Sequence, residues 1–157
     1  MLISDVLRSK NPRKPSEASG EQAATGNAVA TIAPEATVRD LLAELAAHNI
    51  GALVVSADGR TIAGIVSERD VVRRLNEHGA ELLSESVSSI MTVDVYTCHS
   101  RDDVATIRQT MTDHRIRHLP VMDDGALVGL VSIGDVVKST ISELEAEKEQ
   151  LVGYITS

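Results

Sequence analysis

The sequence predicts an α/β protein made of two β-α-β-β-α units that are related by a pseudo-two-fold axis and packed through their sheets, with a flanking helix at each terminus. The chain repeats itself: residues 31–59 match residues 97–125 at an offset of 66, and residues 64–72 match residues 129–137 at an offset of 65. Within each copy, the apolar pattern changes in the same order from strand to helix, to two strands and to a second helix. The identical pairs are Thr31/Thr97, Val38/Val104, His48/His114, Ile50/Ile116, Leu53/Leu119, Val55/Val121, Asp58/Asp124, Gly59/Gly125, Gly64/Gly129, Val66/Val131, Ser67/Ser132, Asp70/Asp135, Val71/Val136 and Val72/Val137.

Composition limits the class of protein. The 157 residues carry a formal net charge of -8, which argues against a nucleic-acid-binding surface because the phosphate backbone favours a basic face. No apolar run approaches the roughly 20 residues that cross a bilayer, and the N-terminus lacks the pattern of a signal peptide. Together with a single cysteine, Cys98, these features predict a cytoplasmic protein with no membrane or nucleic-acid partner.

The first half of the chain begins with residues 1–9, whose apolar residues recur at helical spacing and predict a short N-terminal helix. Residues 10–27 are rich in Pro, Ser, Gly and Glu, which favours a flexible linker. The first unit follows at 28–78. Its expected elements are a strand at 29–32, a helix capped by Thr37 and ending near Asn49, a buried strand at 50–55, a turn at Asp58-Gly59, a strand at 61–66 and a helix from Ser67 to about Glu77.

A linker at 79–92 leads to the second unit at 93–140 and to a C-terminal helical extension at 141–157. The second unit repeats the order of the first. Its expected elements are strands at 94–98, 116–122 and 127–131, a helix at 102–114, a turn at Asp124-Gly125 and a helix from about Ile133. In the extension, Ile141, Leu144, Lys148 and Leu151 share one stripe, which suits packing on the N-terminal helix, contact with a second copy of the chain, or both.

One motif closes the sheet of each unit and opens its last helix. It reads Gly64-Ile65-Val66-Ser67-Glu68-Arg69-Asp70 in the first copy and Gly129-Leu130-Val131-Ser132-Ile133-Gly134-Asp135 in the second, while Ile90-Met91-Thr92 leads into the second unit. With this motif present twice, residues 27 to about 140 resemble a tandem CBS domain pair, also called a Bateman module, of the small stand-alone bacterial type. The resemblance implies a cleft for an adenine-containing ligand: AMP in first place, otherwise ADP, ATP, S-adenosylmethionine or NAD(H).

The resemblance also implies that the Asp of this motif bonds ribose hydroxyls and that the Ser bonds phosphate. Carried over, these residues are Ser67 with Asp70, and Ser132 with Asp135. The chemistry agrees, because a carboxylate offers two acceptors to a vicinal diol and a helix N-terminus offers free N–H groups to a phosphate. The same Ser-x-x-Asp spacing also forms a helix capping box that needs no ligand. Both interpretations stay open, and the serine can serve in both.

Arg115, Arg117 and His118 form the densest basic cluster in this acidic chain. Strand alternation would place the two arginines on one face and His118 on the other, unless the strand bends at Pro120. Such a cluster suits an anionic phosphate, although solvated charges on an edge strand are the alternative. Because the first copy has Asn, Gly and Ala at the matching positions, we expect the second cleft to be the better phosphate site.

The remaining candidate ligand contacts lie at strand ends and helix starts around each cleft. Arg69 also fits a solvated helix face. The candidates are Thr31, Ile50, Gly51, Ala52 and Arg69 with Ser67 and Asp70 for the first unit; Thr97, Leu119 and Pro120 with the basic cluster, Ser132 and Asp135 for the second; and Met91, Val95 and Ile116 against the adenine.

The sequence contains no phosphate-binding glycine loop, no paired metal ligands and no nucleophile beside a base. We therefore expect no enzyme, no metal and no catalytic cofactor. The expected function is a homodimeric module that senses an adenine nucleotide and signals by conformational change to a regulated protein that the sequence does not identify. The alternative is a constitutive dimerisation or scaffold protein whose clefts are vestigial.

Overall fold

The structure, a computed structural model, describes residues 1–10 and 29–157. The linker expected at 10–27 lies, apart from Lys10, outside the described residues. The first unit contains β1 (Thr31–Ile32), α2 (Val38–His48), β2 (Ala52–Val55), β3 (Gly64–Ser67) and α3 (Glu68–His78). Its sheet has the order β1-β2-β3, with β1 parallel and β3 antiparallel to β2. Thr37 caps α2 as expected: the Asp40 N–H donates to its hydroxyl at 3.1 Å, and its own N–H donates to the Asp40 carboxylate at 3.0 Å.

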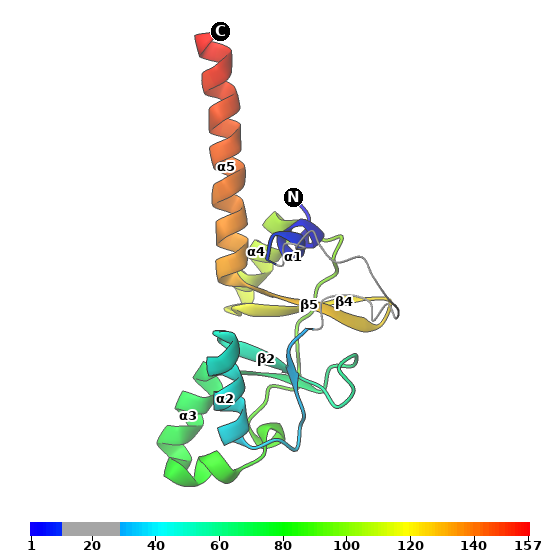
Figure 1. The fold of residues 1–157 in the computed structure, drawn as a ribbon, viewed down its shortest axis with the longest axis vertical. Coiled ribbons are helices and arrows are strands. Elements are labelled where there is room, and N and C mark those ends of the chain that lie inside the picture. Colours follow the sequence, from blue (N-terminus) through cyan, green and yellow to red (C-terminus); the bar gives the residue numbers. More distant parts are fainter. Residues whose placement is uncertain (11–28) are drawn as a thin grey trace, which may run out of the picture.

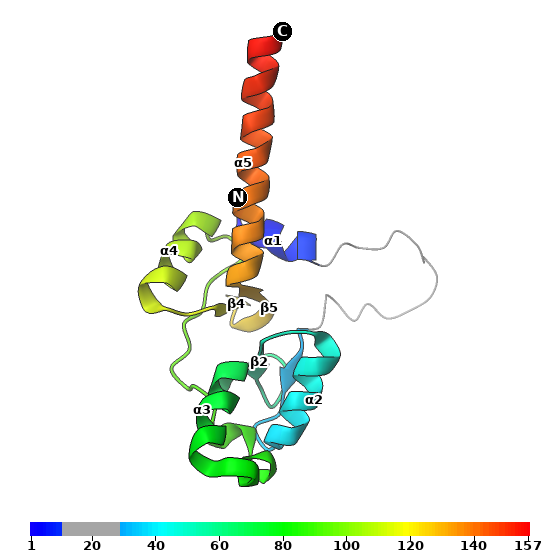
Figure 2. The ribbon, with the colours of Figure 1, turned by 90° about the vertical axis from the view of Figure 1, so that its left-hand side faces the viewer.

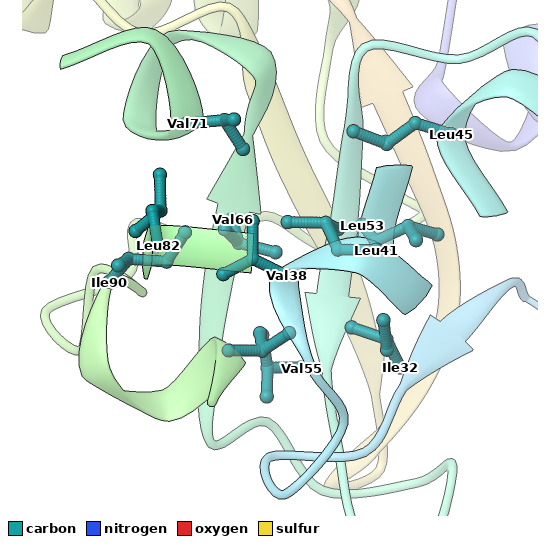
Figure 3. Packing of buried hydrophobic residues seen from close by; sticks show 11 residues of the cluster. Ile32, Val38, Leu41, Leu45, Leu53, Val55, Val66, Val71, Leu82 and Ile90 are labelled. Atoms are coloured by element: carbon teal, nitrogen blue, oxygen red, sulfur yellow. The ribbon is translucent and has the colours of Figure 1, made fainter. Parts of the chain in front are cut away.

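An aliphatic core holds the first unit together. All four residues of β2 are buried, in agreement with a strand covered on both faces. Figure 3 shows Leu53 and Val66 of the sheet against Val38 and Leu41 of α2. Leu82 and Ile90, from the segment after α3, close the same cluster. The connection between the two units is therefore part of the first core.

The second unit contains α4 (Val104–His114), β4 (His118–Asp123), β5 (Ala126–Ser132) and the start of α5 (Ile133–Thr156). β4 and β5 are antiparallel, with a register shift at Val121/Met122. The strand expected at 94–98 is wrong in extent, since only Cys98 pairs, in a parallel bridge with Val121. The reason is that Thr92 still pairs with Ile65 of the first unit, so that the next residues span the distance between two sheets.

Two lead-in segments complete the cores of the units. One is residues 1–10, which contain α1 (Ile3–Lys10), and the other is residues 85–92, which contain the short 3-10 helix η2 (Val87–Ser89); a further 3-10 helix, η1, spans Gly79–Ser84. Ile3 and Val6 are buried in the second core, and Val87 and Ile90 in the first. Each unit is thus completed by the segment that precedes the other unit in the sequence.

Figures 1 and 2 show the β4–β5 hairpin stacked over the first sheet, with α2 and α3 on the outer side of the first unit and α1 and α4 on the outer side of the second. Across the junction, the Leu127 N–H donates to the carbonyl oxygen of Arg60 at 2.9 Å. α5 projects far beyond the body, and every residue from Ile141 to Ser157 is exposed. None of the helices in the described ranges is long and apolar enough to cross a membrane.

Candidate functional site

A cleft of about 330 Å³ opens at the junction of the two units, and its walls come from both. The first unit supplies the start of β2, residues of β3 and the first turns of α3, and the second unit supplies residues 115–118, from the end of α4 to the start of β4. The connecting segment forms a third wall. The lining residues are Gly51, Ala52, Ile65, Ser67, Glu68, Arg69, Asp70, Arg73, Thr92, Asp94, Val95, Tyr96, Arg115, Ile116, Arg117 and His118.

Arg115, Arg117 and His118 all line this cleft. The expectation that His118 points away from the arginines is wrong, because β4 begins only at His118. Arg115 instead ends α4 in the left-handed conformation, with φ 54°, as Asn49 ends α2 with φ 51°. Strand alternation therefore does not apply to residues 115–117.

The basic cluster shares its cleft with the Ser-x-x-Asp motif of the first unit. The Ser67 N–H and hydroxyl donate to the Asp70 carboxylate at 2.8 and 3.1 Å. Asp70 thus takes part in a cap at the start of α3 and also lines the cleft. The two interpretations of this motif are compatible here, because a carboxylate has further lone pairs for a ligand.

The grouping of candidates by sequence repeat differs from the structure. Ser132 and Asp135 were grouped with the basic cluster, but they do not line this cleft. They form a reciprocal cap at the start of α5, where the Ser132 N–H donates to Asp135 at 2.9 Å and the Asp135 N–H donates to Ser132 at 3.1 Å. The observed cleft combines the helix start of the first unit with the helix-to-strand connection of the second, which a linear repeat does not reveal.

Asp135 has a partner of its own. Lys10, the last residue of α1, donates to the Asp135 carboxylate at 2.9 Å and to the carbonyl oxygen of Leu130 at 3.1 Å. Burial would raise the pKa of Asp135, but the hydrogen bonds from Lys10 and Ser132 prevail and hold that pKa below its usual value.

His118 lies between the two helix starts. Burial lowers its pKa below the usual value and the charge of Lys10 lowers it further, against the opposing carboxylates of Asp135 and Glu68. The balance of these effects favours the neutral imidazole. A Cβ atom at Gly51 would lie 3.6 Å from the imidazole, so that the two units are in close contact at this point.

The other candidates divide into three groups. Gly51, Ala52, Arg69, Val95 and Ile116 line the cleft. Leu119 and Pro120 are buried in the second unit, and Ile50 and Met91 pack against the first core. Thr31 pairs with Val54 in the sheet, and Thr97 is exposed; neither lines the cleft.

Arg73 and Tyr96 also line the cleft, and four lining residues were not candidates: Ile65, Glu68, Thr92 and Asp94. The Tyr96 ring stacks on the His114 ring, with centroids 4.4 Å apart. Tyr96 is half-exposed, so a planar group in the cleft has an aromatic surface available. A neighbouring hollow of about 360 Å³ shares Arg69, Arg115 and Arg117 with the cleft and extends toward Met111 and Ile133. The shared arginines make the region between the two hollows positive.

Known proteins show the same architecture. The CBS domain family model matches residues 26–77 and 87–141. The mitochondrial CBS domain-containing protein CBSX3 of Arabidopsis thaliana is 38% identical over 157 residues, which covers 98% of this chain and 71% of that protein. The crystal structure of the CBS-domain protein ATU1752 from Agrobacterium tumefaciens is 36% identical, with a TM-score of 0.74 over 89% of this chain and 99% of that one.

The fold and the matched residues define a tandem pair of CBS domains, the Bateman module. This chain belongs to the CBS domain family, and its two units are the two members of the pair. A ligand-bound relative is also known: the CBS domain protein PAE2072 from Pyrobaculum aerophilum, which is 25% identical with a TM-score of 0.67 over 86% of this chain and 89% of that one, was solved in complex with AMP.

Proposed function

We propose that this chain is a regulatory module that senses an adenine nucleotide in the cleft between its two CBS units. The observation that carries the proposal is that Asp70, at a helix start of one unit, shares a cleft with Arg115 and Arg117 of the other. The arrangement combines an acceptor for a ribose diol with cations for a phosphate. The AMP complex of PAE2072 supports an adenine ligand, and AMP, ADP, ATP and NAD(H) all carry these two groups.

The electrostatics of the cleft suit a nucleotide better than a simple anion. Asp70, Glu68 and Asp94 bring negative charge to the lining that Arg69 and the arginine pair oppose. A free phosphate would meet both signs, whereas a nucleotide separates its diol from its phosphate and can place each beside its own partner. Apolar contacts for the base come from Val95, Ile116 and Ile65, with Tyr96 at the rim.

Signalling follows from the position of the cleft at the junction. A ligand that contacts Asp70 on one unit and Arg117 on the other stabilises one mutual orientation of the units. It shifts the equilibrium only as far as its affinities for the two orientations differ. The role we propose is therefore regulatory rather than catalytic, and the regulated protein would read the orientation of the units. We place this module in the cytoplasm because its single cysteine suits a reducing compartment.

A thermal-unfolding panel with AMP, ADP, ATP, NAD, NADH and S-adenosylmethionine tests the proposal. A ligand at 100 times its dissociation constant stabilises the fold by about 2.7 kcal/mol, which for this chain length raises Tm by about 5–10 °C. Asp70→Ala should abolish the shift. The matched control is Asp40→Ala, which removes the equivalent cap carboxylate of α2 outside the cleft and should leave the shift intact. A panel in which no nucleotide raises Tm contradicts the proposal.

We further propose that the module is a homodimer joined through α5. Val137, Ile141, Leu144, Lys148, Leu151 and Ile155 follow one another at steps of 4, 3, 4, 3 and 4 residues, the spacing of a coiled-coil seam. The apolar members are all at least 45% exposed. A seam of this kind on a projecting helix is best covered by the same seam of a second copy. Sedimentation equilibrium should show a dimer for the wild type and a monomer for Leu144→Glu with Leu151→Glu.

Ala146→Glu is the control for the dimer, because it introduces a glutamate on the opposite side of α5 and leaves the seam unchanged. A wild-type monomer at all concentrations contradicts the dimer. The coiled-coil seam also supports the alternative function, a constitutive scaffold, because dimerisation through α5 needs no ligand. A dimer whose Tm responds to none of the nucleotides in the panel favours the scaffold over the sensor.

A further inference from the structure

The two repeat-equivalent carboxylates, Asp70 and Asp135, differ in what binds them. Both accept the N–H of their cap serine, at 2.8 and 2.9 Å. Asp135 also accepts a hydrogen bond from the Lys10 ammonium at 2.9 Å. Within residues 1–10 and 29–157, by contrast, the hydrogen-bond donors to Asp70 come from Ser67 alone. One helix start is therefore open to a ligand, and the other already holds a cation.

The backbone holds Lys10 in place. It ends α1, whose Ile3 and Val6 are fully buried in the second core. The ammonium makes a second hydrogen bond, to the carbonyl oxygen of Leu130 at 3.1 Å. The fixed backbone keeps the ammonium within reach of two acceptors, the Asp135 carboxylate and the Leu130 carbonyl oxygen.

The pseudo-two-fold shows that this pairing is specific to one cleft. The lead-in segments correspond at an offset of 84, since Ile3 matches Val87 and Leu7 matches Met91. Leu7 lies against Gly129 as Met91 lies against Gly64. The same offset pairs Lys10 with Asp94, which lines the first cleft. At equivalent positions of the two lead-in segments, Asp94 lines the same cleft as Asp70, whereas Lys10 binds Asp135.

We propose that Lys10 occupies the second nucleotide position of the pair, so that the chain binds one nucleotide, at Asp70, and keeps the Asp135 position closed by its own side chain. This inference rests on the proposed function. The ammonium competes directly with a ribose diol, because both need the Asp135 carboxylate. Lys10 gives Asp135 an opposite charge as well as a hydrogen bond, whereas a diol gives the carboxylate hydrogen bonds alone. A diol therefore does not displace Lys10, because displacement would separate the ion pair.

Equilibrium dialysis with AMP on five chains tests the inference: the wild type, Lys10→Met, Lys10→Arg, Asp70→Ala, and Lys10→Met with Asp70→Ala. Methionine keeps most of the length of the side chain and removes its charge, whereas arginine keeps the charge. We expect one AMP per chain for the wild type and for Lys10→Arg, two for Lys10→Met, none for Asp70→Ala, and one for the double variant.

The outcomes separate the two proposals. If Lys10→Met binds no more AMP than the wild type, the inference fails, whatever the wild type binds. If the wild type and Asp70→Ala bind alike while the double variant still gains a site, the proposed site at Asp70 fails and the role of Lys10 stands. Circular dichroism shows whether each variant is folded. For a Lys10→Met chain that does not fold, Lys10→Gln replaces it, with the same expected gain and the same overturning result.

Discussion

Adding one methyl group at each of two equivalent glycines should have unequal effects on stability. Gly64 and Gly129 are repeat partners, and each lies against a lead-in segment. A Cβ atom at Gly64 would lie 2.7 Å from the Met91 sulfur and 2.7 Å from the backbone oxygen of Thr92. A Cβ atom at Gly129 would lie 2.7 and 2.8 Å from the terminal carbons of Leu7. Both distances are too short, but the atoms that must move differ.

At Gly64 the obstacle is backbone. The Thr92 oxygen accepts the Ile65 N–H at 2.9 Å, so that moving it breaks a hydrogen bond that joins the linker to β3. Overpacking of this kind costs about 1–3 kcal/mol, and removal of a glycine recovers only about 0.4–1 kcal/mol from the unfolded chain. At Gly129 the end of a flexible side chain can turn away, and we expect a cost below about 1 kcal/mol.

Urea unfolding of a double-mutant cycle measures the difference. Leu7→Ala removes the obstacle at Gly129, so the cost of Gly129→Ala should vanish in that background. Met91→Ala leaves the Thr92 oxygen in place, so the cost of Gly64→Ala should persist. For a chain of this size, each kcal/mol corresponds to about 2–4 °C in Tm. Equal costs for the two glycines, or full rescue by Met91→Ala, would refute the reasoning.

Three further predictions follow from single sites. Burial, with the nearby carboxylates, raises the pKa of the Cys98 thiol to about 12; Ellman's reagent at pH 8 should label it only as fast as the protein unfolds, and immediate labelling would contradict this. Because the pKa of Asp135 is lowered in the folded state, its contribution to stability is present above the ordinary value of 3.8 and is lost as the pH falls through the folded pKa. Lys10→Met should make stability fall less steeply in urea titrations between about pH 5 and pH 2. Thr37→Ala should destabilise the fold by about 1 kcal/mol through loss of the α2 cap, measurable as a lower urea midpoint; an unchanged midpoint would argue against the cap.

The fold could be predicted from the sequence because its main signals are local or repeated. The run at β2 indicated a strand buried on both faces, and Thr37 indicated the start of α2. The strand predicted at 94–98 shows the limit of prediction from local sequence patterns. Its apolar pattern was compatible with a strand, but strand pairing needs a partner. Thr92 pairs with the first sheet and Cys98 with the second, and the residues between them span the gap without a strand partner.

The site was harder to predict because it depends on how the units stack. Sequence could select Asp70 and Arg117 as ligand-type residues, yet it grouped each with its own repeat. Asp94 gave no signal, since a single acid in a linker is typical of solvated chain. Lys10 gave none either, since its partner is 125 positions away in the sequence. Such contacts are set by the three-dimensional arrangement rather than by residue spacing.

The exchange of lead-in segments has a consequence for how the chain acquires its structure. The Val104 N–H donates to the carbonyl oxygen of Met1 at 3.0 Å, and the Val38 N–H donates to that of Glu85 at 2.9 Å. Residues 1–10 therefore stay without their final neighbours until the second half has been made. Long-range contacts of this kind slow folding, and they make the two halves interdependent. A chain cut between the halves would leave an incomplete core in each, so we expect the pair to unfold in one transition rather than as two separable domains.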